Sequence, residues 1–153
     1  MLIEGTHSAQ NSKFALIVSR FNNQITDKLL VGATDCLLHH GARNDDIDVI
    51  KVPGALEIPI AALKAAQTKK YDAIICLGTV IRGHTPHFEY VAGETTRGVG
   101  QVGLQTGVPT IFGVLTTNTL EDAVDRAGSK ESNKGWQAAM TAMEMIDVIK
   151  KIL

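Results

Sequence analysis

The chain has 153 residues, of which 15 are basic and 16 acidic, so its formal net charge at pH 7 is -1. A chain of this length is expected to form a single domain, residues 1–153, that buries roughly 70% of the surface exposed on unfolding without help from disulfides or metals. The balanced charge, without any basic run, argues against a protein that binds nucleic acid or a membrane surface.

Two cysteines, Cys36 and Cys76, are the only ones in the chain. They lack C-x-x-C spacing and fall in a predicted helix and a predicted buried strand, which is typical of reduced core residues in a cytosolic protein. The first 13 residues show neither a basic start nor an apolar signal core, and no apolar run approaches the length of a membrane span. We therefore expect a cytoplasmic protein.

Short runs rich in Val and Ile alternate with longer segments of helical spacing. In chain order we predict strand 1–5, strand 14–19, helix 26–40, strand 47–52, helix 58–68, strand 73–79, helix 87–103, strand 109–115, helix 119–128 and helix 133–153. Gly41 marks the end of the first helix, and Thr119 with Asp122 three residues later marks the start of the fourth. Four glycines weaken helix 87–103, so packing must stabilise it.

Repeated strand–helix units with short connections favour right-handed crossovers and a parallel sheet covered on both faces. The expected fold is α/β, a flavodoxin-like three-layer αβα sandwich with a four-stranded parallel sheet. The short strand at residues 1–5 has no evident partner in its own chain, so we expect it to pair with a neighbouring subunit.

The last helix also favours an oligomer. Its polar positions fall on one narrow stripe, whereas six apolar residues spread over the rest of the helix, namely Trp136, Met140, Met143, Met145, Ile146 and Ile149. A helix this widely apolar is expected to be buried on more than one side. Exposed apolar surface of this size is rare on monomers, so we expect a homo-oligomer in which part of this set faces a neighbour.

Polar and aromatic residues gather where the predicted strands end, which is where ligands bind in open parallel sheets. Phe21 follows the first strand and could stack on a flat heterocycle, with the Asn22 amide bonding to it. A Phe that covers the sheet edge beside a capping Asn is an equal alternative. After the second strand, Glu57 could accept hydrogen bonds from a polyol, or favour the dipole of the helix that it starts.

The run from Gly78 to Tyr90 carries a cation, a hydroxyl and two imidazoles, and its glycine-containing turn opens a helix, so an anion such as phosphate is the expected ligand. His84 and His87 have H-x-x-H spacing, but nothing completes a metal shell, and we expect no metal. Acid–base work by one histidine is favoured, because an imidazole can move protons near neutral pH. A His87 that merely caps the helix is the alternative.

Four separated motifs resemble the lumazine synthase family, over nearly the whole chain. They are Ser19-Arg20-Phe21-Asn22, Pro53-Gly54-Ala55-Leu56-Glu57-Ile58-Pro59, the run from Gly78 to Tyr90, and Phe112-Gly113-Val114-Leu115-Thr116 with Asp125-Arg126-Ala127-Gly128 and Asn133-Lys134-Gly135. Their order and spacing together are specific. The resemblance implies a flavodoxin-like fold and pentamers, some of which pack into 60-subunit icosahedral shells.

The resemblance further implies the condensation of 5-amino-6-(D-ribitylamino)uracil with 3,4-dihydroxy-2-butanone 4-phosphate to 6,7-dimethyl-8-ribityllumazine, without a cofactor or metal. It assigns proton transfer to His87, stacking on the pyrimidine to Phe21, and the phosphate to Arg126. Further implied binding residues are Asn22, Ala55, Leu56, Glu57, Thr79, Val80 and Ile81 around the ring and ribityl chain, His84 and Thr85 at the phosphate, and Phe112 and Lys134, which with Arg126 come from the adjacent subunit.

Two positions depart from the family pattern. Leu56 stands where many relatives have an aromatic residue, and Ser132 stands in a turn where Gly is usual and which bears on shell formation, so pentamer and shell both stay open. A non-catalytic lumazine- or flavin-binding or shell-forming relative is the alternative function. A signalling phosphoacceptor domain would need an acidic cluster at the strand ends, which the chain lacks.

Overall fold

Four parallel strands form the centre of the fold. In the computed structural model, which describes residues 1–153, they are β1 (Phe14–Ser19), β2 (Ile47–Val52), β3 (Ala73–Ile81) and β4 (Thr110–Thr117). Their order across the sheet is β2-β1-β3-β4, and all three pairings are parallel. The predicted four-stranded parallel sheet is confirmed.

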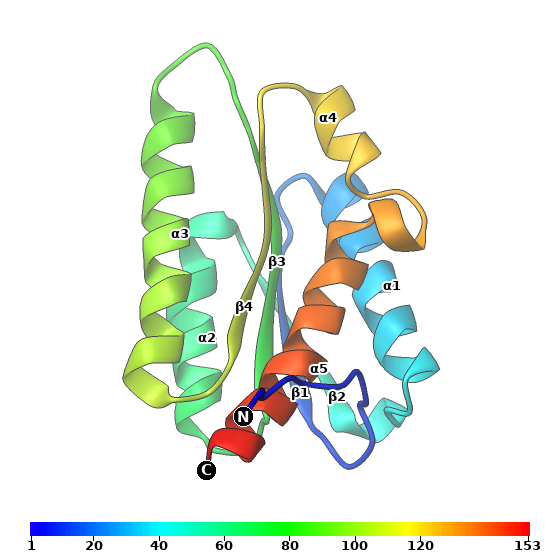
Figure 1. Cartoon of the computed structure of the whole chain (residues 1–153). Helices are drawn as coiled ribbons and strands as arrows, with labels where there is room; N and C mark the ends of the chain where they lie inside the picture. The colour runs from blue at the N-terminus through cyan, green and yellow to red at the C-terminus, as the bar shows by residue number, and fades with distance from the viewer.

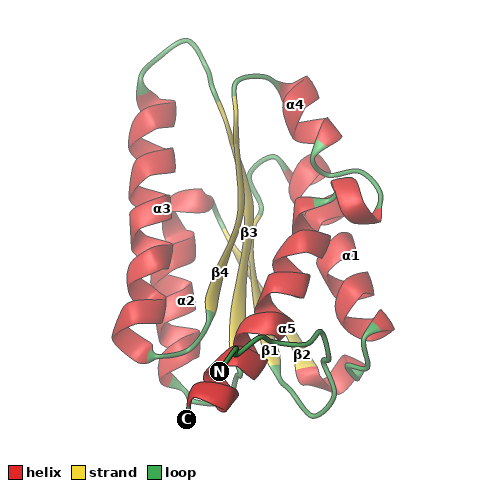
Figure 2. Cartoon of the chain, in the orientation of Figure 1, coloured by secondary structure: helices red, strands yellow, loops and turns green.

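Helices cover both faces of this sheet (Figures 1 and 2). The five α-helices are α1 (Asn23–His39), α2 (Ile58–Gln67), α3 (His87–Thr106), α4 (Leu120–Asp125) and α5 (Lys134–Ile152). In Figure 1, α2 and α3 lie on one side of the sheet, and α1 and α5 lie on the other. The three-layer sandwich predicted from the sequence is therefore confirmed. No helix combines the length and the apolar character that crossing a membrane requires.

The two faces of the sheet bury two separate cores, as the alternation of side chains along a strand requires. In β1, Phe14, Leu16 and Val18 join the core under α1 and α5, whereas Ala15 and Ile17 join the core under α2 and α3. Every residue of β1 is buried, so this strand has no solvent-facing side. Such continuous apolar strands are typical of parallel sheets covered on both faces.

Helix α3 shows how packing stabilises a glycine-rich helix. It extends three residues beyond the predicted end, to Thr106, and Gly107 follows in the left-handed conformation, with φ 73°. At Gly98 an added Cβ would lie 2.7 Å from Pro59 in α2, so this glycine permits the close approach of the two helices. Val99 and Val102 are buried on the same side of the helix.

The expectation for α5 is only partly met. Its polar stripe is exposed, as predicted, but Trp136, Met140, Met143 and Ile146 pack in the chain's own core. Of the apolar set named from the sequence, Met145 is exposed, at 37%. Much of the set is used inside the chain, because α5 packs against both the sheet and α1, and the expectation that part of it faces a neighbour stays a prediction.

The segment before β1 differs from its prediction. Residues 1–5 form no strand within the chain, and the segment instead contacts α5. The N–H of Thr6 donates to Asp147 Oδ2 at 2.8 Å, and Lys151 Nζ donates to the Glu4 carbonyl at 2.8 Å. The Thr6 N–H and Lys151 lower the pKa of Asp147. Pairing of this segment with a neighbouring subunit stays a prediction.

The two cysteines and the cap of α4 agree with the predictions from the sequence. Cys36 and Cys76 are free and buried, and burial raises the pKa of each thiol to about 12. The Thr119 hydroxyl accepts the N–H of Asp122 at 3.1 Å, so the predicted cap of α4 is confirmed. The helix ends earlier than predicted, at Asp125, because the chain then enters a bridge to the start of α5.

Candidate active site

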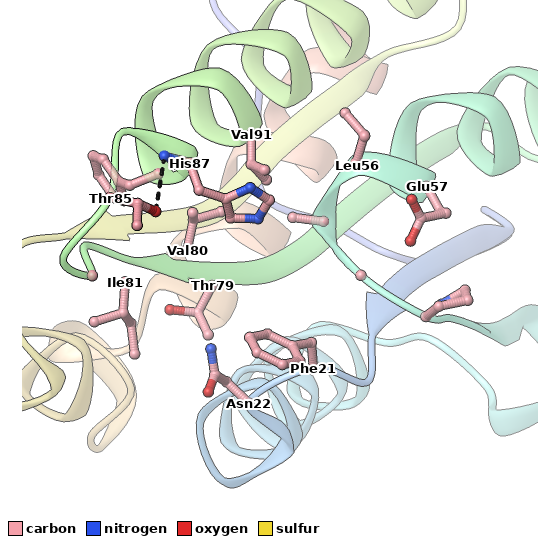
Figure 3. A pocket seen from close by; sticks show the side chains of 15 residues that line it. Phe21, Asn22, Leu56, Glu57, Thr79, Val80, Ile81, Thr85, His87 and Val91 are labelled. Carbon is pink, nitrogen blue, oxygen red and sulfur yellow. Dashed lines mark hydrogen bonds between the residues drawn. The ribbon is translucent and has the colours of Figure 1, made fainter.

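A crevice of about 560 Å³ opens where β1, β2 and β3 end (Figure 3). Its volume lies within the range usual for small-molecule sites. Ten residues predicted from the sequence line it, namely Phe21, Asn22, Ala55, Leu56, Glu57, Thr79, Val80, Ile81, Thr85 and His87. The carboxyl ends of these strands meet at one edge of the sheet, which brings together segments that are far apart in the chain.

The turn after β1 presents an aromatic ring to the crevice. Its backbone is tied to the end of β2, because the N–H of Phe21 donates to the Pro53 carbonyl at 3.0 Å. The Phe21 ring is 70% exposed, so it does not cover the sheet edge. Asn22 starts α1 in the left-handed conformation, with φ 61° and ψ 48°, and its side chain makes no cap hydrogen bond. The capping alternative for Asn22 is wrong, and its amide is free for a ligand.

The turn after β2 supplies the opposite wall. Ala55 is buried, Leu56 is 48% exposed and Glu57 is half-buried at the start of α2. The Glu57 carboxylate forms no ion pair and no cap hydrogen bond, and Figure 3 shows it at the rim of the crevice. An acidic group in this position can accept hydrogen bonds from hydroxyls.

The floor comes from the end of β3, which runs two residues beyond its predicted end, to Ile81, and pairs there with Thr117 of β4. Thr79 is 3% exposed, and its Oγ1 has no hydrogen-bond partner within the chain. A buried hydroxyl without a partner is costly, so it favours a ligand that supplies a polar atom.

The loop after β3 carries His87 to the mouth of the crevice. Its first residue, Arg82, donates to Asn118 Oδ1 at 2.9 Å, pairs with Glu89 at 2.8 Å and lies over the Phe88 ring at 4.5 Å. These contacts fix the loop between β4 and the first turn of α3. Figure 3 shows the imidazole of His87 projecting into the crevice, across from Phe21.

The N–H of His87 donates to Thr85 Oγ1 at 3.4 Å, so it is the Thr85 hydroxyl that caps this turn, and the imidazole of His87 makes no cap hydrogen bond. His84, by contrast, does not line the crevice. No group of three or more His, Cys, Asp and Glu side chains is placed to hold a metal ion.

Three predicted residues lie at a second pocket, of about 370 Å³. Phe112, Arg126 and Lys134 line it together with residues of β4, which is an edge strand. Neither cation forms an ion pair within the chain. The crevice and this pocket share no lining residue, so a single chain holds the two halves of the predicted site apart.

The chain is similar to known proteins over nearly its whole length. A sequence profile of the family described as 6,7-dimethyl-8-ribityllumazine synthase matches residues 11–150. The chain belongs to this family. A 6,7-dimethyl-8-ribityllumazine synthase from Desulfatibacillum aliphaticivorans is 53% identical over 150 residues, which cover 98% of this chain and 97% of that protein.

Several crevice residues of this lumazine synthase family member were not predicted as site residues. They are Pro53, Gly54, Gly83, Phe88 and Val91. Val91 lies one turn after His87 on α3, so the helical period could have indicated it. Gly83 and the turn residues Pro53 and Gly54 line the crevice because the backbone passes there, and the sequence carries no direct signal for that path.

The backbone of Asn22 generates a testable prediction. L-residues other than glycine pay about 1–2 kcal/mol in the left-handed conformation, and Asn tolerates it better than Ala. We expect N22A to unfold at lower urea concentration than N22G, with a difference of about 1 kcal/mol in the free energy of unfolding. Both variants lose the amide, so each serves as the control for the other. Equal stability of the two would contradict a left-handed Asn22.

Proposed function

We propose that the crevice of one subunit and the Arg126–Lys134 pocket of its neighbour form one active site. This site condenses 5-amino-6-(D-ribitylamino)uracil with 3,4-dihydroxy-2-butanone 4-phosphate. The products are 6,7-dimethyl-8-ribityllumazine, inorganic phosphate and water, in the penultimate step of riboflavin biosynthesis. The observation that carries the proposal is the exposed Phe21 ring and the His87 imidazole facing the same crevice, in a chain of this family.

The pyrimidine substrate belongs in the crevice. The Phe21 ring is available for stacking on a flat heterocycle, and the free amide of Asn22 lies next to it. The buried hydroxyl of Thr79 gains a partner, and Glu57 accepts hydrogen bonds from the ribityl chain. Ala55, Leu56, Val80 and Ile81 supply the apolar walls.

The phosphate belongs between the two halves. His84 and Thr85 approach it from the loop after β3, and Arg126 approaches it from the neighbour, which also contributes Phe112 and Lys134. Two unpaired cations in one pocket favour a doubly charged anion, because charge-assisted hydrogen bonds to phosphate are strong.

An oligomer follows from this division of the site. In one chain the pocket that contains Arg126 and Lys134, called the cationic pocket below, lies along the edge strand β4. It lies away from the crevice, so catalysis needs a second subunit. We propose a homopentamer, with five such sites, as the smallest active assembly. The turn that carries Ser132 bears on whether the pentamers assemble further into a 60-subunit shell.

The chemistry requires several proton transfers. The amine of the pyrimidine attacks the ketone to give a carbinolamine, which loses water to form an imine. Phosphate then leaves by elimination, and the resulting enol becomes a ketone. The second nitrogen attacks this ketone and a second water is lost as the ring closes. His87, at the mouth of the crevice, gives and takes these protons, because an imidazole serves in both directions. The amine is already a good nucleophile, so holding the two substrates together supplies most of the acceleration, up to about 7–11 kcal/mol.

The first prediction from the proposed function concerns the reaction itself. The purified protein, mixed with both substrates, will form the lumazine absorbance band and inorganic phosphate together, faster than the mixture without protein. Absorbance and a phosphate assay, followed in parallel, measure this. Binding of the lumazine with a rate equal to that of the protein-free mixture would identify a non-catalytic relative instead.

The second prediction concerns His87. We expect H87A to lower kcat by about tenfold to a hundredfold without abolishing turnover, because positioning of the substrates remains. The control is H39A, since His39 lies at the end of α1 and does not line the crevice. Complete loss of activity in a folded H87A variant that still binds the pyrimidine would refute the modest role given to proton transfer.

The third prediction concerns Arg126. Loss of a charge-assisted hydrogen bond costs about 1.5–3 kcal/mol, so R126A will raise KM for the phosphate-bearing substrate more than KM for the pyrimidine. K130A is the matched control, because Lys130 lies in the same turn over the Trp136 ring and outside the cationic pocket. An unchanged KM for the phosphate-bearing substrate in R126A would overturn the assignment.

A further inference from the structure

The segment between Arg126 and Lys134 folds back on itself. Ala127 and Asn133 form an antiparallel bridge, and the N–H of Lys134 donates to the Arg126 carbonyl at 2.8 Å. The backbones of Arg126 and Lys134 are therefore directly hydrogen-bonded, and both residues line the same pocket. Their placement depends on this bridge, because they lie at the two ends of one irregular segment.

No ion pair fixes either side chain. Neither Arg126 nor Lys134 has a carboxylate partner within the chain. The guanidinium of Arg126 donates to the Asp122 carbonyl, at 3.1 Å. The position of both residues therefore depends on the backbone of this segment and on the contacts that hold it.

Asn133 makes the contacts that do so. It is 2% exposed, and its Nδ2 donates to the carbonyls of Lys28 at 3.1 Å and of Gly128 at 2.9 Å. Its Oδ1 accepts the N–H of Trp136 at 3.1 Å. One buried amide thus joins α1, the segment after α4 and the first turn of α5.

Backbone packing leaves this amide no room to move. An added Cβ at Gly32 would lie 2.2 Å from Asn133 Oδ1, and one at Gly135 would lie 2.0 Å from the Leu29 carbonyl oxygen. Helix α1 is therefore in contact with the Asn133 side chain at Gly32 and with the backbone of the first turn of α5 at Gly135. A junction packed this tightly transmits any change at Asn133 to its neighbours.

Helix capping alone does not account for the choice of residue. Ser and Asp cap a helix as well as Asn does, because capping needs only the side-chain oxygen. The two hydrogen bonds from Nδ2 reach carbonyls outside α5, and only an amide can donate both while its oxygen caps the helix.

We propose that Asn133 is a positioning residue for the phosphate-bearing substrate. By tying the segment after α4 to α1, its amide holds Arg126 at the position that the phosphate group needs. Asn133 is buried and acts through Arg126. This inference rests on the proposed function, in which Arg126 binds the phosphate.

The test compares N133S with A142G in the full-length oligomer. Serine keeps a capping oxygen but cannot donate to both carbonyls. Ala142 is buried further along α5, away from the junction, so A142G lowers the unfolding temperature without touching it. We expect N133S to raise KM for the phosphate-bearing substrate, and the inhibition constant of inorganic phosphate, by roughly tenfold, since small misplacements in a site are costly. KM for the pyrimidine should stay within about twofold, and A142G should leave both KM values unchanged.

The outcomes separate this inference from the proposed function. If N133S only lowers the unfolding temperature, or raises both KM values equally, Asn133 is merely structural and the inference fails. If R126A leaves KM for the phosphate-bearing substrate unchanged, the phosphate assignment itself fails. If N133S does not assemble, the same KM comparison is made with G32A. The added methyl group displaces the Asn133 side chain, while alanine itself favours the helical conformation of α1.

Discussion

Burial of the central strands on both faces is the constraint on which the rest of the structure depends. Every residue of β1 is buried, and β3 is buried from Ala73 to Val80. Because neither face of these strands is open to solvent, polar groups can gather only where the strands end. The crevice lies at that edge, and each of its walls continues a strand whose position the two cores determine.

The edges of the sheet have a different consequence. β4 has a partner on one side only, and the cationic pocket lies along it, separate from the crevice. In the proposed function, the groups that bind the phosphate lie apart from the aromatic crevice of the same chain, so assembly with further copies completes the site. The proposed function and the proposed pentamer are thus one argument, since each needs the Arg126–Lys134 pocket to face a neighbouring crevice.

The junction of α1 with α5 links fold stability to this shared site. The same buried amide of Asn133 caps α5, bonds to α1 and closes the segment between the two cations. Gly135 allows the backbones of α1 and α5 to touch there, and Gly32 leaves room for the Asn133 side chain. Precision at the phosphate end of the site therefore comes from helix packing behind it, whereas the crevice takes its precision from the sheet.

The sequence by itself determined the element types, the parallel sheet and most of the candidate site, because apolar periodicity and strand-end residues are local signals. Ten of the predicted residues line one crevice, and the tertiary structure alone shows that His84 lies outside it and that Phe112, Arg126 and Lys134 line another pocket. The contact of residues 4–6 with α5, and the inward packing of Trp136 and Met140, were also decided only there. These features depend on packing between segments that are far apart in the chain, and local patterns of apolar and polar residues do not specify which segments pack together.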